Sequence, residues 1–380
     1  MKHLLIQFHT DTISPQDDSV LTKYYNSIWE HEYYHKPDAF WELPKWAGEL
    51  SHNLINANKE HEFMVLTEPI ELNADIIFGS VLNINLELFK KLVIINWNKT
   101  FILGGYVNKH ELDVFDNVIW FDSIFDYCNK TGIQYSGGVN WDIFRDEWCI
   151  PRITMSYGCK HRCKFCTIPN EIVEVPKHDI YSQVLALMPL KFNLVYIDDK
   201  TFGQCDNYRS LIKLEKVIFE FNKQFKGFVV QTTAPMVAKI DWTTLPVYAV
   251  EVGVETYNNS ILKELRKPSS EVLVNTAHGI LEKAGVKYIP NIVVGFLQEN
   301  EATYSKTLNY IIRTNMLHAN IYNLAIYDDA DIAEDVNIDN SNDSNELESD
   351  KSYNSFEKNE LNKSVIETMA QILLIKNNKL

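Results

Sequence analysis

The chain contains 380 residues, of which 46% are hydrophobic, and this length predicts two or three globular domains, each with its own core. No window reaches the roughly 18 apolar residues of a membrane span, and the N-terminus lacks a small-residue cleavage pattern, so we expect a soluble, cytoplasmic protein. The formal net charge of −15 disfavours attraction to a nucleic-acid backbone.

Short apolar runs in the first 147 residues predict the buried strands of an open α/β sheet. They cover residues 2–8, 62–68, 74–80, 92–97 and 99–106, and residues 41–59 carry helical spacing between them. The last run contains Gly104 and Gly105, which would let a loop or a flat cofactor tail approach the end of that strand. We therefore expect a Rossmann-like domain over residues 1–147.

Residues 24–46 are unusually dense in Tyr, Trp and Phe. Aromatic faces can stack on a planar substrate such as a nucleobase. We favour a different interpretation, in which these side chains cover the seam between two domains.

A second alternating pattern covers residues 148–327. Six strand-like runs, at residues 152–157, 192–197, 227–233, 248–254, 288–294 and 319–326, are separated by helical stretches such as 207–223 and 270–285. Such alternation implies parallel strands joined by right-handed crossovers, and six units are two fewer than a closed eight-stranded barrel. The sequence therefore predicts a partial (β/α)6 TIM-like barrel after the first domain.

The barrel pattern is followed by an acidic segment, residues 328–356, and a final helix over residues 357–380. Between Asp328 and Asp350 there are ten Asp and Glu and no Lys or Arg. We expect this segment to be mobile and dispensable, although a lid over bound substrate is the alternative. The helix places Leu361, Val365 and Met369 at helical spacing and is expected to be the sixth barrel helix.

Three of the six cysteines, Cys159, Cys163 and Cys166, stand within eight positions, in the loop after the first barrel strand. Barrel enzymes build their active sites at this end of their strands. Crowded cysteines do not resemble the disulfide framework of a small secreted domain, so reduced thiols are available as ligands.

Three thiolates suit a 4Fe–4S cluster that leaves one iron free for another ligand. A structural zinc ion would need four protein ligands, and Cys128, Cys149 and Cys205 offer no second pair. We therefore expect that these three cysteines are not ligands. We also expect the lysines and His161 of the loop to lower the thiol pKa values.

The motif CKHRCKFC, residues 159–166, resembles the cysteine signature of the radical S-adenosylmethionine (SAM) superfamily, with an aromatic residue before its last cysteine. The resemblance continues in residues 195–203, 250–267 and 291–304, which look like later strand regions of the cobalamin-associated branch. It implies that Cys159, Cys163 and Cys166 hold a 4Fe–4S cluster. SAM would chelate the fourth iron and be cleaved reductively to a 5′-deoxyadenosyl radical.

The resemblance also implies roles in SAM binding for residues outside the cysteine motif. Phe165 would pack near the cluster and adenine, Glu255 would hydrogen-bond the ribose or amino group, and Asp198 and Asp199 would approach the amino group. Gly295 would let the backbone pass close to adenine, and Glu299 matches the acidic end of its motif. Leu297 and Gln298 depart from the common Pro-Gly form.

Residues 99–132 resemble the last third of a cobalamin-binding domain. The Asp-x-His-x-x-Gly pattern that supplies an axial histidine is absent, because His9 and His52 stand in no such context. Two alternatives therefore remain: cobalamin binds without that ligand, or the domain has kept its fold and lost the cofactor.

The sequence thus predicts a radical SAM enzyme that abstracts hydrogen from a carbon of a small molecule or modified base. Methyl transfer and rearrangement both stay open, and a flavodoxin or ferredoxin would supply electrons. One alternative is a transfer-RNA methylthiotransferase, but residues 1–127 lack the second cysteine triad of those enzymes. The other is an iron–sulfur redox sensor, which would not need a six-stranded barrel.

Overall fold

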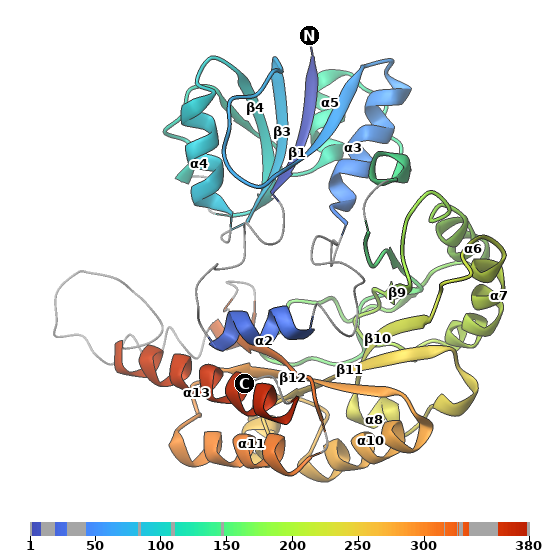
Figure 1. Ribbon diagram of the computed structural model, residues 1–380, viewed down its shortest axis with the longest axis vertical. Helices are drawn as coiled ribbons and strands as arrows, with labels where there is room; N and C mark the ends of the chain where they lie inside the picture. Colours follow the sequence, from blue (N-terminus) through green and yellow to red (C-terminus); the bar gives the residue numbers. More distant parts are fainter. Residues whose placement is uncertain are drawn as a thin grey trace. The chain divides into compact units, whose positions relative to one another are not determined.

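The computed structural model describes residues 2–8, 20–28, 43–82, 85–107, 111–145, 148–314, 316–324, 326, 330–333 and 356–377. The chain divides into two compact units, each built on a parallel sheet (Figure 1). The first unit contains strands β1 to β5. The second contains helix α2 and most of the chain from Arg152 onward, while residues 186–192 belong to the first unit. The boundary expected after residue 147 stays a prediction.

The first unit has a five-stranded sheet in the order β2-β1-β3-β4-β5, with all neighbours parallel. The strands are β1 (His3–Phe8), β2 (His61–Leu66), β3 (Ile76–Leu82), β4 (Thr100–Tyr106) and β5 (Val118–Trp120). The helices are α3 (Lys45–Asn56), α4 (Leu86–Ile95) and α5 (Ile124–Thr131), with a 3-10 turn η3 (Trp141–Phe144). Helices α3 and α4 lie on opposite sides of the sheet (Figure 1). This strand order is that of doubly wound sheets.

The prediction of a strand at residues 92–97 in this unit is wrong. The run forms the end of α4, in which Phe89, Leu92 and Val93 are buried and Ile94 is 61% exposed. Spacings of three and four residues are the periodicity of a helix, whereas a strand alternates every two. The short strand β5 carries too few residues to show any periodicity.

The second unit contains six parallel strands in the order β13-β12-β11-β10-β9-β6, which confirms the predicted partial barrel. The strands are β6 (Arg152–Ile153), β9 (Leu194–Ile197), β10 (Gly227–Thr233), β11 (Val247–Glu255), β12 (Lys287–Val294) and β13 (Asn320–Asn323). Sequence neighbours are also neighbours in the sheet, so the carboxyl ends of all six strands lie along one edge.

Helices cover the outer face of this curved sheet (Figure 1). Those labelled in the figure are α6 (Lys177–Leu185), α7 (Leu211–Phe221), α8 (Ala234–Val237), α10 (Glu271–Ala284) and α11 (Glu301–Arg313). The unit also contains α9 (Asn259–Glu264), whose Ile261 packs in one apolar cluster with Phe165, and the 3-10 turns η4 (Asp206–Ser210) and η5 (Trp242–Thr244). The final helix α13 (Phe356–Lys376) packs against α11, β12 and β13, in the place expected of a sixth barrel helix.

The first predicted barrel strand, residues 152–157, is divided in two. β6 pairs with β9, and β7 (Ser156–Tyr157) turns away to pair antiparallel with β8 (Val173–Glu174). At the break, Gln183 of α6 accepts a hydrogen bond from Thr154 N at 2.8 Å and donates one to Thr154 O at 3.0 Å. This side chain replaces the strand neighbour that the backbone of Thr154 has lost.

Helix α2 (Val20–Ile28) also belongs to the second unit, which the sequence did not predict. It packs against α13, and the buried Tyr24 hydroxyl donates to Ala319 O at 2.7 Å and accepts from Ala319 N at 2.8 Å. Most of the aromatic stretch 24–46 lies outside the described residues, so its expected place at a domain seam stays a prediction.

Residues 330–333 correct the expectation that the whole acidic segment is mobile, whereas its dispensability stays a prediction. Ile332 is fully buried among Ile261, Leu265 and Phe296, and its backbone N donates to Lys164 O at 2.9 Å. The burial of Ala330 and Ile332 is enough to order residues 330–333 within this acidic sequence. Residues 334–355 lie outside the described part of the chain.

Among the helices that the structure describes, none is long and apolar enough to cross a bilayer.

Replacing Ile332 by Ala should destabilise the second unit by about 2–5 kcal/mol, because it removes buried methyl groups and leaves a cavity. Urea denaturation would measure this as a lower unfolding midpoint. Ile312→Ala deletes the same atoms from a side chain that is 52% exposed and should change stability by less than about 0.5 kcal/mol. Equal effects of the two substitutions would contradict the anchored position of Ile332.

Candidate active site at the cysteine loop

The cysteine loop, residues 158–170, leaves β7 at the carboxyl edge of the barrel sheet and is held at three points. Gly158 opens it with φ +74°, where an added Cβ would meet Glu171 O at 1.9 Å. Cys159 N donates to Pro169 O at 3.0 Å, which closes the base of the loop. Its middle is fixed by Lys164, whose N donates to Leu265 O at 3.0 Å. The loop therefore has a defined conformation.

The three cysteines differ in their surroundings. Cys166 is exposed, whereas Cys159 and Cys163 are half-buried, and Cys159 Sγ lies 3.1 Å from Thr201 Oγ1. Burial raises the pKa of Cys163 to about 11, against the opposing charge of Lys267. The expectation that cations lower the thiol pKa values is therefore wrong for Cys163. Burial also lowers the pKa of His161, with the neighbouring lysines adding to the effect, so its ring favours the neutral form.

In the described residues, no three His, Cys, Asp or Glu side chains converge as they would around a single metal ion. A four-iron cluster makes a different demand, because each thiolate ligates a different iron and the sulfur atoms need not converge on one point. Three thiols on one anchored loop at the barrel's carboxyl edge fit that demand.

A buried ion pair lies beside the cysteines. Lys267 Nζ is 2.5 Å from Glu255 Oε1, and both side chains are less than a tenth exposed. Burial alone would lower the pKa of Lys267, but the charges of Glu255, Cys163 and Cys159 outweigh it and raise the pKa. Lys267 Nζ also lies 5.9 Å from the ring centroid of Phe165. The pair brings a fixed positive charge to the thiols.

Glu255, predicted to contact SAM, is thus paired with a lysine that sequence reasoning missed. Lys267 stands among other cations, Lys263 and Arg266, and no local pattern shows which of the three turns inward. Gly253 makes the space for it, since a Cβ there would meet Lys267 Nζ at 2.6 Å. The contact of Glu255 with SAM stays a prediction.

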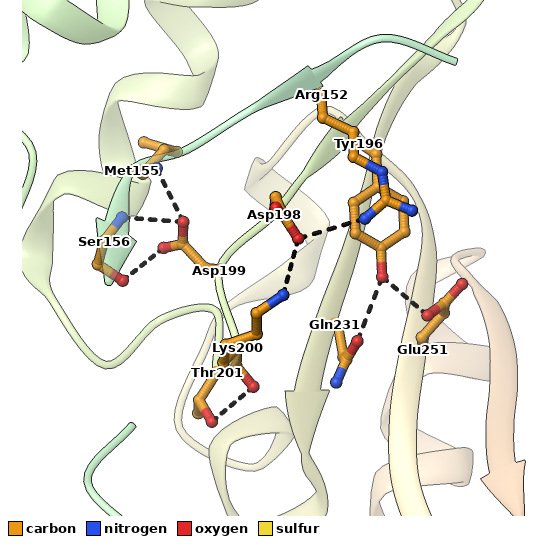
Figure 2. Close-up of polar contacts among 10 residues, drawn as sticks. All are labelled: Arg152, Met155, Ser156, Tyr196, Asp198, Asp199, Lys200, Thr201, Gln231 and Glu251. Carbon is orange, nitrogen blue, oxygen red and sulfur yellow. Dashed lines mark hydrogen bonds and ion pairs between the residues drawn. The ribbon is translucent and has the colours of Figure 1, made fainter. Parts of the chain in front are cut away.

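Asp199 holds the strand that leads into the cysteine loop (Figure 2). Its carboxylate accepts hydrogen bonds from Met155 N at 2.8 Å, Ser156 N at 2.9 Å and Ser156 Oγ at 2.7 Å. Burial raises the pKa of Asp199, although these hydrogen bonds oppose the shift. Both oxygens are engaged by protein, so the geometry supports a positioning role rather than direct contact with a ligand.

Asp198 points away from Asp199 and toward two cations (Figure 2). Its Oδ1 lies 3.2 Å from Arg152 Nη1 and 3.1 Å from Lys200 Nζ. A third of its side chain is exposed. A ligand could therefore reach this carboxylate, and its predicted contact with the amino group of SAM stays a prediction.

A layer of polar side chains lines the inner face of the barrel below these acids (Figure 2). Tyr196 Oη donates to Glu251 Oε2 at 2.8 Å and lies 3.4 Å from Gln231 Oε1, while the Arg152 guanidinium lies 4.5 Å from the ring centroid of Tyr196. Burial raises the pKa of both Tyr196 and Glu251. Barrel interiors are usually filled by branched apolar residues, so this polar layer calls for a functional reason.

The turn after β12 contains the predicted pair Gly295 and Glu299. Glu299 Oε2 accepts hydrogen bonds from Gly295 N at 2.9 Å and Phe296 N at 3.2 Å. Burial raises the pKa of Glu299 to about 7, although these bonds and others from Thr256 and Tyr304 favour the charged form. The carboxylate therefore shapes the turn from within.

Phe165 reaches this turn from the cysteine loop, with its ring centroid 5.6 Å from that of Phe296. It packs on the apolar cluster that includes Ile332. The cysteine loop and the Gly295 turn are thus in direct contact, and the place of Phe165 beside the cluster and the adenine stays a prediction.

Gly104 and Gly105 have a structural explanation within the first unit. A Cβ on Gly105, which has φ +127°, would meet Val81 O at 2.1 Å, and one on Gly104 would meet Phe121 O at 2.9 Å. The backbone of neighbouring segments fills both spaces. These glycines therefore provide no cradle for a cofactor in this structure.

Replacing Lys267 by Met should destabilise the second unit by about 3–5 kcal/mol, because it leaves the carboxylate of Glu255 buried without its partner. Adding Glu255→Gln should recover most of the loss, since the pair is then removed as a whole. Chemical denaturation of the two variants measures both effects. An exposed control is Lys263→Met, and no recovery in the double variant would contradict the pairing.

The raised pKa of Glu299 makes stability depend on pH. The protonated form is favoured in the folded state, so its contribution is complete below pH 4.5 and is lost as the pH rises through about 7. Between pH 5.5 and 8 this contribution falls by about 2 kcal/mol. Glu299→Gln should remove that part of the pH dependence in denaturation experiments, and the exposed control Glu220→Gln should retain it. Identical pH profiles of parent and Glu299→Gln would rule out this titration.

No family model matches the sequence, and no curated protein matches it. Among solved structures, the chain resembles the cobalamin-dependent S-adenosylmethionine radical enzyme OxsB with aqua-cobalamin and S-adenosylmethionine bound. The TM-score is 0.57 at 14% identity, over 90% of this chain and 55% of OxsB. The chain thus spans little more than half the length of that enzyme.

A second similar structure is the radical S-adenosylmethionine methyltransferase TsrM from Kitasatospora setae with cobalamin and a 4Fe–4S cluster bound. Its TM-score is 0.61 at 10% identity, over 93% of this chain and 81% of TsrM. At these identities the likeness concerns architecture. The chain has the fold of radical SAM enzymes, including cobalamin-dependent ones, as its cysteine motif predicted.

Proposed function

We propose that this protein is a radical SAM enzyme in which Cys159, Cys163 and Cys166 hold a 4Fe–4S cluster. One observation carries the proposal: the three cysteines lie on the anchored loop at the carboxyl edge of the first barrel strands, in a chain with this fold. When bound, the cluster supplies the electron that cleaves SAM, and the resulting radical abstracts hydrogen from a substrate carbon.

The chain's own residues prepare the site for charged partners. Asp199 fixes the approach of the cysteine loop, and Lys267 places a cation beside thiols that become anionic when they bind iron. Because burial disfavours the thiolate of Cys163, this cation offsets part of the cost of deprotonation. Phe165 and Phe296 provide an apolar wall that limits water at the turn.

The polar layer on the inner barrel face is the proposed floor of the substrate site. Arg152 and Gln231 are partly accessible, while Tyr196 and Glu251 are buried behind them and hold their orientation. A small molecule with hydrogen-bonding groups would find fixed donors and acceptors there. A preorganised floor of this kind holds one carbon of the substrate toward the radical.

Some observations favour cobalamin binding by the first unit, and others oppose it. The first unit has the strand order of doubly wound sheets, which bind ligands beyond the carboxyl ends of their strands, and two similar structures contain cobalamin. The predicted glycines do not fit a cradle, and His52 is bonded to Ser136 at 3.1 Å. We therefore propose that the first unit is a cobalamin-type domain by its fold alone.

The electron would come from a flavodoxin or ferredoxin in the cytoplasm. The net charge of the whole chain is negative, but the cysteine loop exposes Lys160 and Arg162 beside Cys166. Small acidic redox proteins are drawn to such a local positive patch.

Anaerobic reconstitution should give about four irons per chain, and Cys163→Ala should lose both the cluster and SAM cleavage, because two thiolates do not replace three. Iron analysis and the yield of 5′-deoxyadenosine measure the two effects. Full iron occupancy in Cys163→Ala would overturn the ligand assignment. An intact cluster without SAM cleavage in the parent protein would favour the redox sensor instead.

The other three cysteines supply the matched control. Cys128 and Cys149 are buried in the first unit, and Cys205 is half-buried in the second. Replacing all three with Ser should leave the iron content unchanged. A loss of about half of the iron would reveal a second cluster, as methylthiotransferases carry.

A further inference from the structure

The backbone is strained at both ends of the buried ion pair between Lys267 and Glu255. Glu255 ends β11 with φ +63°, and Arg266, directly before Lys267, has φ +53°. Residues with a branched or long side chain rarely adopt this left-handed conformation, and among the other described residues only Asn58 and several glycines do so. Strain of this kind persists where the surrounding structure over-determines it, often at functional sites. The position of the pair is therefore specified by the chain on both sides.

The strand itself leaves room for the pair at Gly253. A Cβ built on Gly253 would lie 2.6 Å from Lys267 Nζ and 2.7 Å from Glu255 Oε1, so any other residue would displace both charges. The side chains of Lys267 and Glu255 are 8% and 9% exposed. Because water is largely excluded, their charges act on neighbouring groups with little screening.

The positive end of the pair faces the cysteine loop. That loop is bonded to the backbone at Leu265, and Lys267 Nζ lies 5.9 Å from the ring centroid of Phe165, in the middle of the loop. Burial is the main cause of the raised pKa of Cys163; among the charges, Lys267 opposes this shift more than Glu255 adds to it. At the thiols, the field of the lysine therefore exceeds that of the carboxylate.

We propose that the Lys267–Glu255 pair sets the reduction potential of the 4Fe–4S cluster. Lys267 stabilises the reduced, more negative cluster, and Glu255 limits this effect. One electron enters from the flavodoxin or ferredoxin, no atom is transferred, and the charge of the cluster becomes more negative by one. The inference rests on the proposed function and gives Lys267 a positioning role, since it ligates no iron.

The sign of the effect follows from electrostatics. A fixed cation favours whichever state of its neighbour carries more negative charge, and the net charge around an iron–sulfur cluster is one determinant of its potential. Removing Lys267 should therefore lower the potential. Because Glu255 lies 2.5 Å from Lys267, it cancels part of the field of the lysine, and removing Glu255 should raise the potential.

Redox titration of the reconstituted holoprotein with dithionite, in the absence of SAM, would test the proposal through the EPR signal of the reduced cluster. Lys267→Met should make reduction about tenfold less favourable, which lowers the midpoint by about 59 mV for one electron. Glu255→Gln should raise the midpoint, and the combined variant should fall between the parent and Lys267→Met. Lys263→Met, exposed on α9, should keep the midpoint of the parent.

An unchanged midpoint in Lys267→Met with a full cluster would overturn the inference and leave the proposed function intact. A fall of the midpoint in both single variants would indicate lost packing rather than charge and would also overturn it. If Lys267→Met holds no cluster, the combined variant decides, because it leaves no buried charge unpaired. Its midpoint should lie below that of the parent, and an equal or higher value contradicts the inference. A parent protein without a cluster would overturn the proposed function itself.

Discussion

The site depends on how the chain leaves the barrel sheet at its first strand. Regular pairing ends at Ile153, and the freed backbone is satisfied by two side chains, Gln183 at Thr154 and Asp199 at Met155 and Ser156. Their amide and carboxylate oxygens accept hydrogen bonds from backbone N–H groups, as the carbonyl oxygens of a neighbouring strand would. The break aims β7 and the cysteine loop across the carboxyl edge. A continuous strand would have carried the three thiols past the sheet in a straight line.

The sequence was informative where short apolar runs form strands that are buried along most of their length. Six runs rich in branched apolar residues predicted six parallel strands, and all six lie in the barrel in sequence order. Prediction was wrong at residues 92–97, where the exposed Ile94 and Ile95 of α4 look like strand residues unless the whole helix is considered. The acidic composition of residues 330–333 suggested that they are mobile, and this was wrong. The burial of the Ile332 side chain stabilises an ordered backbone there despite the acidic neighbours.

The cysteines of the candidate site were predicted by spacing, but their electrostatic environment was not. Nearby cations in the sequence suggested low thiol pKa values, whereas the structure half-buries Cys163 and gives it one effective cation, Lys267, already shared with Glu255. Whether a lysine faces water or a thiol depends on tertiary packing. The role of Asp199 was hidden for the same reason, since two adjacent acids look equivalent until one is found to hold the backbone.

A second constraint links the C-terminal helix to the barrel. Hydrophobic burial has no direction, so Val365 and Met369 alone would tolerate small rotations and shifts of α13. The hydrogen bond from Tyr304 to Asn362 removes that freedom, because a one-residue shift would bury both polar groups without partners. Tyr304 in turn contributes to the environment of Glu299, whose carboxylate shapes the turn at Gly295. A polar chain therefore runs from α13 through α11 to the β12 turn, and it sets the register of the helix against the turn that faces the cysteine loop.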